Sequence, residues 1–292
     1  MPMPPFERVA AALPVWFAFS RSLLGVLRLT LTAWHITRGV VIVATQFPSQ
    51  DARQRQVLVQ CWSSDVLRAL GVDVQVQGSL EPGAKLLVAN HVSWLDVIVL
   101  QSLCPQVRFV AKAEVRRWPL IGRLVVGART FFVERDRPRK TRTLVDALAV
   151  ALSAGETVAV FPEGTTSDGH AVLPFRTSLL QAALIAAVPV QPLALRYADA
   201  HHAVSRRAPY IEADTLLGSF WRTARAEGLV VSVQALAAQG PAVGHRRPLA
   251  TALRLAIQES LDAGPLALPA ERANGPAVAQ AGFGAALPHG DS

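Results

Sequence analysis

The sequence predicts an α/β fold: a mainly parallel, mixed sheet flanked by helices and preceded by an amphipathic, membrane-associating helical region at the N-terminus. Two observations support this prediction. From Val72 onward, short runs rich in β-branched residues alternate with helical segments, as they do where crossover helices join parallel strands. Hydrophobic residues make up 51% of the 292-residue chain and charged residues only 17%, so the chain can bury a large core.

Residues 1–70 are expected to form the membrane-associating part. Val9–Thr45 is strongly apolar but is interrupted by Arg21, Arg28, His35 and Arg38. No uncharged stretch therefore reaches the roughly 20 residues of a clean transmembrane helix. Arg21, Arg28 and His35 repeat every seven residues and form one polar stripe on a helix. We interpret the segment as one helix or a helical pair in the lipid interface, with the stripe toward phosphate head groups; the alternative is a helix packed on the domain's own core.

Residues 71–262 are expected to form the domain that contains the sheet. Strands are predicted at Val72–Gln77, Lys85–Ala89, Val107–Ala111, Thr130–Glu134, Thr157–Phe161, Val190–Tyr197 and Leu229–Leu236. Helices are predicted at Asp96–Leu103, Arg139–Ala154, Ser178–Ala187, Leu216–Ala226 and Leu249–Leu261. Residues 263–292 are rich in Ala, Pro and Gly and have little periodicity, which predicts a disordered tail.

The chain has 29 Lys and Arg against 21 Asp and Glu, a net charge of +8. This charge favours an anionic partner: a phospholipid surface, a phosphorylated substrate or nucleic acid. The arginines are spread over several segments without a recognisable nucleic-acid-binding motif, so nucleic acid is the weakest of the three. Cys61 and Cys104 are the only cysteines, which excludes a disulfide framework and a thiolate zinc site.

The first candidate catalytic group is Asn90-His91-Val92-Ser93-Trp94-Leu95-Asp96, directly after a predicted strand. Parallel sheets bind ligands beyond the carboxyl ends of their strands. A helix starting near Ser93 would fold Asp96 back onto the His91 imidazole, which fixes the tautomer and leaves the other nitrogen as a base. No G-x-S-x-G motif supplies a nucleophile, so we expect the pair to activate a hydroxyl brought by a substrate. The alternative is that His91 only caps the strand–helix junction.

Two further groups follow predicted strands. Phe161-Pro162-Glu163-Gly164-Thr165 combines one carboxylate with small residues, which suits an open, polar floor where Glu163 accepts hydrogen bonds from substrate hydroxyls. A strand ending in Arg135 places a guanidinium at the same rim, a group matched to phosphate. The alternatives are an ordinary turn at the first site and a solvated charge run at the second.

The order of these blocks resembles the glycerolipid acyltransferase family, whose best-known members are the 1-acylglycerol-3-phosphate acyltransferases. The resemblance covers about Val72–Tyr197 and rests on His91-x4-Asp96, the aromatic strand ending in Arg135, Phe161–Thr165, and Val188-Pro189-Val190-Gln191-Pro192. It implies that His91 removes the proton of the acceptor hydroxyl as that oxygen attacks an acyl thioester, and that Asp96 orients His91. The substrate-binding residues that it implies are Glu163, Gly164 and Thr165 for the acceptor pocket, Arg135 for the acceptor phosphate, and Pro189 for the acyl-facing wall.

Two positions depart from the family's pattern. Arg129 stands where many members carry Gly, and Pro174-Phe175-Arg176-Thr177-Ser178 replaces Pro-Phe-Lys-x-Gly. Arg176 keeps the positive charge, so an anionic ligand is still expected there. The form around Arg129 is similar to that of acyltransferases that acylate lyso-ornithine lipid, an acceptor that is not a glycerophosphate.

The resemblance therefore predicts an O-acyltransferase of phospholipid biosynthesis that acts on a lysophospholipid. The first candidate acceptor is 1-acyl-sn-glycerol-3-phosphate and the alternative is lyso-ornithine lipid. The expected donor is acyl-CoA or acyl-carrier protein, with no metal and no other cofactor. We expect a peripheral or monotopic protein on the cytoplasmic face of the cell membrane, which binds no nucleic acid. A catalytically inactive membrane adaptor and a nucleic-acid-binding protein are the alternatives from other classes.

Overall fold

A computed structural model describes residues 5–134, 138–211, 214–240 and 244–264. The helices in these ranges are α1 (Pro5–Thr45), α2 (Ala52–Leu70), α3 (Leu95–Leu103), α4 (Ile121–Gly127), α5 (Pro138–Ser153), α6 (Gln181–Ala186), α7 (Leu216–Ala224) and α8 (Arg246–Asp262), with 3-10 helices η1 (Phe47–Ser49) and η2 (Ala113–Arg117). The strands are β1 (Val72–Gln77), β2 (Lys85–Ala89), β3 (Arg108–Lys112), β4 (Phe131–Val133), β5 (Thr157–Val160), β6 (Val190–Ala198) and β7 (Leu229–Ala235). The predicted strands are confirmed, whereas α4 was not predicted. Most of the predicted tail, from residue 265 on, lies outside the described residues.

The strands form one seven-stranded sheet in the order β1-β7-β6-β2-β5-β3-β4. Neighbouring strands are parallel except for β6 and β7, which are antiparallel. The prediction of a mainly parallel, mixed sheet is therefore confirmed. Because β2 to β6 all run in one direction, their carboxyl ends lie at one edge of the sheet and their amino ends at the other. These are the carboxyl edge and the amino edge below.

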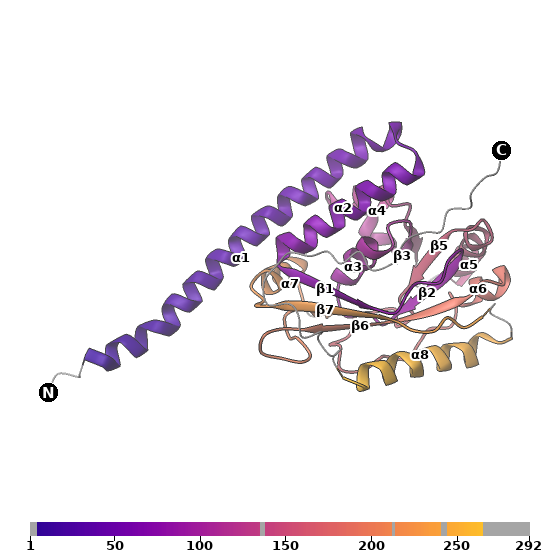
Figure 1. Cartoon of the computed structure of the whole chain (residues 1–292). Coiled ribbons are helices and arrows are strands. Elements are labelled where there is room, and N and C mark those ends of the chain that lie inside the picture. Colours follow the sequence, from indigo (N-terminus) through magenta and orange to yellow (C-terminus); the bar gives the residue numbers. More distant parts are fainter. Residues whose placement is uncertain (1–4, 135–137, 212–213, 241–243, 265–292) are drawn as a thin grey trace, which may run out of the picture.

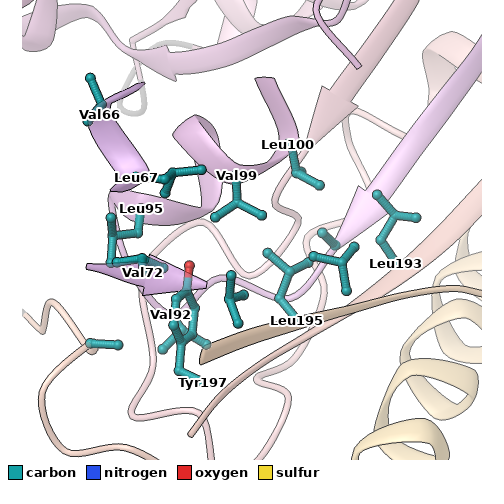
Figure 2. Packing of buried hydrophobic residues seen from close by; sticks show 14 of the residues in the cluster. Val66, Leu67, Val72, Val92, Leu95, Val99, Leu100, Leu193, Leu195 and Tyr197 are labelled. Atoms are coloured by element: carbon teal, nitrogen blue, oxygen red, sulfur yellow. The ribbon is translucent and has the colours of Figure 1, made fainter. Parts of the chain in front are cut away.

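Helices cover both faces of the sheet, because alternate residues of a strand point to opposite faces. In β2, Leu87 and Ala89 join the apolar core that contains residues of α2 and α3, whereas Leu86 and Val88 join the core that contains residues of α5, α6 and α8. Figure 1 shows α8 on the opposite side of the sheet from α2 and α3. Figure 2 shows the first core, where side chains of α2 and α3 pack against those of β6.

Helices α1 and α2 form a hairpin beside the sheet, and the N-terminal half of α1 extends beyond it (Figure 1). Helix α2 starts at a capping box between Asp51 and Gln54 and ends at Gly71, whose φ of 70° is the left-handed conformation of a helix stop. It buries Ser63, Val66, Leu67 and Leu70. Although it belongs to the predicted membrane-associating region, α2 is therefore also part of the core.

The polar stripe of α1 faces the protein, which corrects the prediction that it would face phosphate head groups. Arg28 donates hydrogen bonds to the carbonyl oxygens of Ala224 and Ala226, at 3.1 and 2.7 Å, and Arg21 pairs with Glu227. These carbonyls lie at the end of α7, where backbone acceptors lack helical partners and attract cations. The stripe thus fastens α1 to the domain.

Apolar side chains are exposed on the side of α1 away from the stripe, namely Leu23, Val26, Leu27, Trp34 and Val41, and beside the stripe, namely Leu24 and Leu31. The exposed threonines Thr30 and Thr37 donate their hydroxyl hydrogen bonds to carbonyls of the same helix, four residues earlier. By length and composition, Arg21–Thr45 is the one described stretch that could cross a membrane. Core helices and signal sequences pass that same test, so the exposure of these apolar side chains is the more informative observation.

Candidate active site

His91 lies at the carboxyl edge, two residues after the end of β2. The residue between them, Asn90, exchanges two hydrogen bonds with the backbone of Leu195 in β6, at 2.9 and 2.8 Å, which fixes this end of β2 to its neighbour. Helix α3 carries Asp96 in its first turn. His91 Nδ1 lies 2.8 Å from Asp96 Oδ2, so the chain folds back as the spacing predicted.

The Asp96 carboxylate is fully buried and accepts hydrogen bonds from four donors. Oδ2 accepts from His91 Nδ1 and from the backbone N–H groups of Val92 and Ser93, at 2.8 and 3.0 Å. Oδ1 accepts from the hydroxyl of Tyr197, at 2.6 Å. These contacts hold the carboxylate in one orientation. Tyr197 is not among the site residues predicted from the sequence, because its place in an apolar strand did not indicate that its hydroxyl meets Asp96.

The imidazole of His91 is held flat against an aromatic side chain. Its ring stacks on that of Phe161, with centroids 4.1 Å apart and planes at 15°, and Phe161 in turn stacks on Phe109. The His91 side chain remains 20% exposed, and Nε2 has no hydrogen-bond partner among the described residues. A Nδ1 proton directed at Asp96 leaves Nε2 as an unoccupied proton acceptor.

Glu163 connects two loops of the carboxyl edge. Its carboxylate accepts hydrogen bonds from the backbone N–H groups of His91, at 2.6 Å, and Leu173, at 3.0 Å, and the residue is only 4% exposed. Burial, partly offset by these amides, raises the pKa of Glu163 to about 7. Both carboxylate oxygens thus accept backbone hydrogen bonds within the protein, one of them from His91, and the expected contact with substrate hydroxyls stays a prediction.

Gly164 and Arg176 meet in the loop after β5. Gly164 has a φ of 72°, and the Nε of Arg176 lies 3.0 Å from the point where a Cβ on Gly164 would stand. The Arg176 backbone N–H donates to the Pro162 carbonyl at 2.8 Å, while its side chain is exposed. Thr165 is half-buried in the same loop. A side chain at Gly164 would face both an unfavourable backbone conformation and the guanidinium.

Pro189 lies at the opposite edge of the sheet from His91, and its expected place in the acyl-facing wall stays a prediction. It comes directly before β6, and its carbonyl accepts a hydrogen bond from the N–H of Leu86, near the start of β2. Since β6 is parallel to β2, the residue before β6 lies at the amino edge. His91 follows the other end of β2, five residues beyond Leu86, or about 16 Å along an extended chain.

Arg129 also lies at the amino edge, just before β4. Its guanidinium pairs with Glu156 at 3.0 Å, and Glu156 also binds Arg108 at 2.6 Å. Arg129 has a φ of 54°, the left-handed conformation that Gly adopts without strain, and this fits the Gly of the family pattern given above. Its position shows that the departure at Arg129 is not a contact beside His91. Arg135 lies outside the described residues, so its predicted role stays a prediction.

Comparisons with known proteins identify the family of the chain. The acyltransferase family model matches residues 72–196. The lyso-ornithine lipid O-acyltransferase of Pseudomonas aeruginosa is 38% identical to the chain over 74% of this chain and 82% of that protein. The chain belongs to the lysophospholipid acyltransferase family. This acyltransferase is also similar to a protein named 1-acyl-sn-glycerol-3-phosphate acyltransferase from Neisseria gonorrhoeae, at 30% identity over 80% of this chain and 89% of that protein.

Two other comparisons bear on coverage and fold. The lyso-ornithine lipid O-acyltransferase of Brucella abortus is 45% identical to this acyltransferase, over 47% of this chain and about half, 54%, of that protein. The crystal structure of the 1-acyl-sn-glycerophosphate acyltransferase PlsC from Thermotoga maritima matches with a TM-score of 0.64 and 20% identity, over 84% of this chain and 97% of that one. At that identity the match shows the fold alone.

Proposed function

We propose that this acyltransferase moves a fatty acyl group from a thioester to the hydroxyl of its lyso-lipid acceptor, with His91 as general base. The observation that carries the proposal is the pairing of His91 Nδ1 with the buried Asp96 carboxylate at 2.8 Å, while Nε2 stays open. A histidine held in this way is the usual means of removing a proton from an attacking hydroxyl.

In the proposed reaction, Nε2 of His91 takes the proton of the acceptor hydroxyl as its oxygen attacks the thioester carbonyl carbon. The tetrahedral intermediate then collapses, the carbon–sulfur bond breaks, and the thiolate leaves with the proton returned by the imidazolium. Asp96 stabilises that imidazolium by charge at 2.8 Å. The products are the acylated lipid and a free thiol, so the step needs no oxidant and no external base.

Two acceptors have support. The sequence motifs favour 1-acyl-sn-glycerol-3-phosphate, the substrate in the names of relatives that are 30% and 31% identical. Relatives named for lyso-ornithine lipid are 37% to 45% identical, which favours that acceptor. We propose that lyso-ornithine lipid is the preferred acceptor and that 1-acyl-sn-glycerol-3-phosphate is the second candidate. The exposed Arg176, which lies against the loop of Gly164, is the described cation placed to meet an anionic head group at the site.

The experiment that tests this proposal offers acyl-CoA and acyl-carrier protein, each with both lyso-lipids, to the purified full chain and identifies the product by mass spectrometry. We expect acyl transfer with at least one combination and its loss in His91→Ala, with an unchanged circular dichroism spectrum. Full transfer by folded His91→Ala would refute the proposed base. A wild-type preference for 1-acyl-sn-glycerol-3-phosphate would refute the proposed acceptor but leave the base intact.

We also propose that the exposed apolar side of α1 seats the enzyme on the cytoplasmic face of the cell membrane. Val43 of α1 lies against Gly127 of α4, and a groove of about 480 Å³ opens between η2 and α4. Arg116 and Arg123 line this groove together with the exposed Trp118. Guanidinium groups beside an exposed tryptophan suit the level of phosphate head groups, so α1 and this groove would form one lipid-facing surface.

The proposed membrane-binding surface of α1 is tested by pelleting the full chain with vesicles that contain 30% phosphatidylglycerol. Leu27→Glu places a charge on the exposed side of α1, and Val150→Glu places the same charge on the exposed part of α5. We expect Leu27→Glu to reduce the bound fraction several-fold, because burial of a charge in the lipid interface is costly, and Val150→Glu to leave it unchanged. Equal binding by both variants would contradict the proposed membrane-binding surface.

A further inference from the structure

The two oxygens of the Asp96 carboxylate are held by different parts of the chain. The three donors to Oδ2 come from His91, Val92 and Ser93, within five residues of Asp96. The single donor to Oδ1 is the hydroxyl of Tyr197, which lies 101 residues away in sequence. The orientation of the carboxylate is thus set locally at one oxygen and across the sheet at the other.

Tyr197 is itself rigidly placed. It is 2% exposed and belongs to the same core as Val92 and Leu95. Figure 2 shows its ring among these residues, with the hydroxyl oxygen pointing toward the segment that carries them. Two residues earlier in β6, Leu195 is bound to Asn90 through both of its backbone groups. The strand that presents the phenol is therefore anchored next to His91.

From this geometry we propose that Tyr197 is a positioning residue for the reaction: its hydroxyl fixes the Asp96 carboxylate so that Oδ2 stays aimed at His91 Nδ1. The inference rests on the proposed role of His91 as the base. Tyr197 lies one residue beyond the segment 72–196 that the family model matches, so it is not among the residues that identify the family.

The hydroxyl, rather than the ring, is the part of Tyr197 that packing does not explain. A phenylalanine would fill the same core volume, whereas a buried hydroxyl is tolerated only with a partner. Burial, with the adjacent Asp96 charge, raises the pKa of Tyr197 well above its ordinary value. The phenol therefore remains a hydrogen donor at every pH at which the enzyme would be assayed.

Removal of the Tyr197 hydroxyl should change how tightly the His91–Asp96 pair holds a proton. Without Tyr197, Oδ1 is left buried and unpaired, so the carboxylate is a stronger base toward its remaining partners. The His91–Asp96 pair would then hold an additional proton more tightly, and the base would become available only at higher pH. Glu163 is the other titratable group that faces Asp96, and its own protonation must be separated from this effect.

The test compares Tyr197→Phe with Ser102→Ala. Ser102→Ala is a matched control because it also deletes a buried hydroxyl, on α3, and that hydroxyl donates to the Val99 carbonyl of its own helix. For Tyr197→Phe we expect kcat to fall about tenfold, the size expected for one hydrogen bond to a charged group, with KM for both substrates unchanged within about twofold. We expect Ser102→Ala to keep the wild-type kcat.

The pH profile separates positioning from packing. We expect the acid limb of kcat/KM to move upward by up to about one pH unit in Tyr197→Phe, both alone and in the Glu163→Gln background. An unchanged kcat and acid limb in Tyr197→Phe would overturn the inference if His91→Ala is inactive. Activity that survives in His91→Ala would instead show that the proposed function is wrong. A loss of kcat in Tyr197→Phe without any movement of the acid limb would also overturn the inference, because it would show a packing defect alone.

Discussion

The two edges of the sheet hold their carboxylates in opposite ways. At the amino edge, Glu156 is paired with both Arg108 and Arg129. Partial burial alone would raise the pKa of Glu156, but the hydrogen bonds and charges of these two arginines outweigh it and lower the pKa. At the carboxyl edge, Asp96 and Glu163 are buried, and among the described residues neither pairs with an arginine or a lysine.

The difference supports the proposal that proton transfer takes place at the carboxyl edge. An arginine neutralises its carboxylate in every state of the protein, so the cluster at Glu156 is structural. Backbone amides, a phenol and an imidazole satisfy the hydrogen bonds of Asp96 without cancelling its charge. That charge would then stabilise the imidazolium that forms in the proposed reaction, in which His91 takes a proton. Glu156 and Asp96 are thus proposed to have different roles because their hydrogen-bond donors differ.

The largest expected effect is on kcat, when one carboxylate at each edge is replaced by an amide. Asp96→Asn should lower kcat by roughly a thousandfold, because the amide carries no charge for the imidazolium and its NH2 group faces donors that need an acceptor. Glu156→Gln should keep kcat within about twofold. Steady-state kinetics on the two purified variants measure the contrast, and equal losses would remove the functional distinction between the edges.

The second effect concerns stability at the carboxyl edge. The pKa of Glu163 is raised from 4.5 to about 7, so between these values the folded protein binds more protons than the unfolded chain. The free energy of unfolding should therefore fall as pH rises from about 4.5 to 7, by an amount on the order of 3 kcal/mol. Urea unfolding at several pH values should show this slope in the wild type and not in Glu163→Gln; a slope that persists in the variant would assign it to other groups.

Glu156 should make the free energy of unfolding depend on pH in the opposite direction from Glu163, and by a smaller amount. Its pKa is lowered in the folded protein, so its contribution to stability is present above the ordinary pKa of a glutamate and is lost as pH falls through the folded value. Partial exposure reduces the effect, since solvent screens the ion pairs. In the same urea series, Glu156→Gln should lose less stability than the wild type on acidification; an unchanged acid slope would contradict the prediction.

The sequence predicted the parts of the molecule that depend on local patterns. The strands follow from short β-rich runs, and the pairing of His91 with Asp96 follows from a spacing that one turn of backbone can close. The long apolar pattern of α1 was recognised as well. The direction of its polar stripe was not, because the partners of Arg28 lie nearly 200 residues later, at the end of α7.

What the sequence left open at the site depends on the direction and register of the strands. The motif around Pro189 identified a strand, but the edge at which Pro189 lies depends on whether that strand is parallel to β2. Tyr197 resembled any other buried residue of an apolar strand until the register placed its hydroxyl on Asp96. Glu163 was found, but its partners are backbone amides, which the sequence does not locate.

The smallest expected effect tests the amino edge directly. Arg129→Gly restores the residue that many relatives carry and relieves a backbone held at a φ of 54°, but it also removes the ion pair with Glu156. The two contributions are each about 1 kcal/mol or less and oppose one another, so the free energy of unfolding should change little. The ratio of kcat/KM between lyso-ornithine lipid and 1-acyl-sn-glycerol-3-phosphate should also stay the same, because Arg129 is at the opposite edge from His91. A changed ratio in competition assays would show that the amino edge influences acceptor choice. That result would contradict the proposal that the amino edge is structural and that only the carboxyl edge takes part in the reaction.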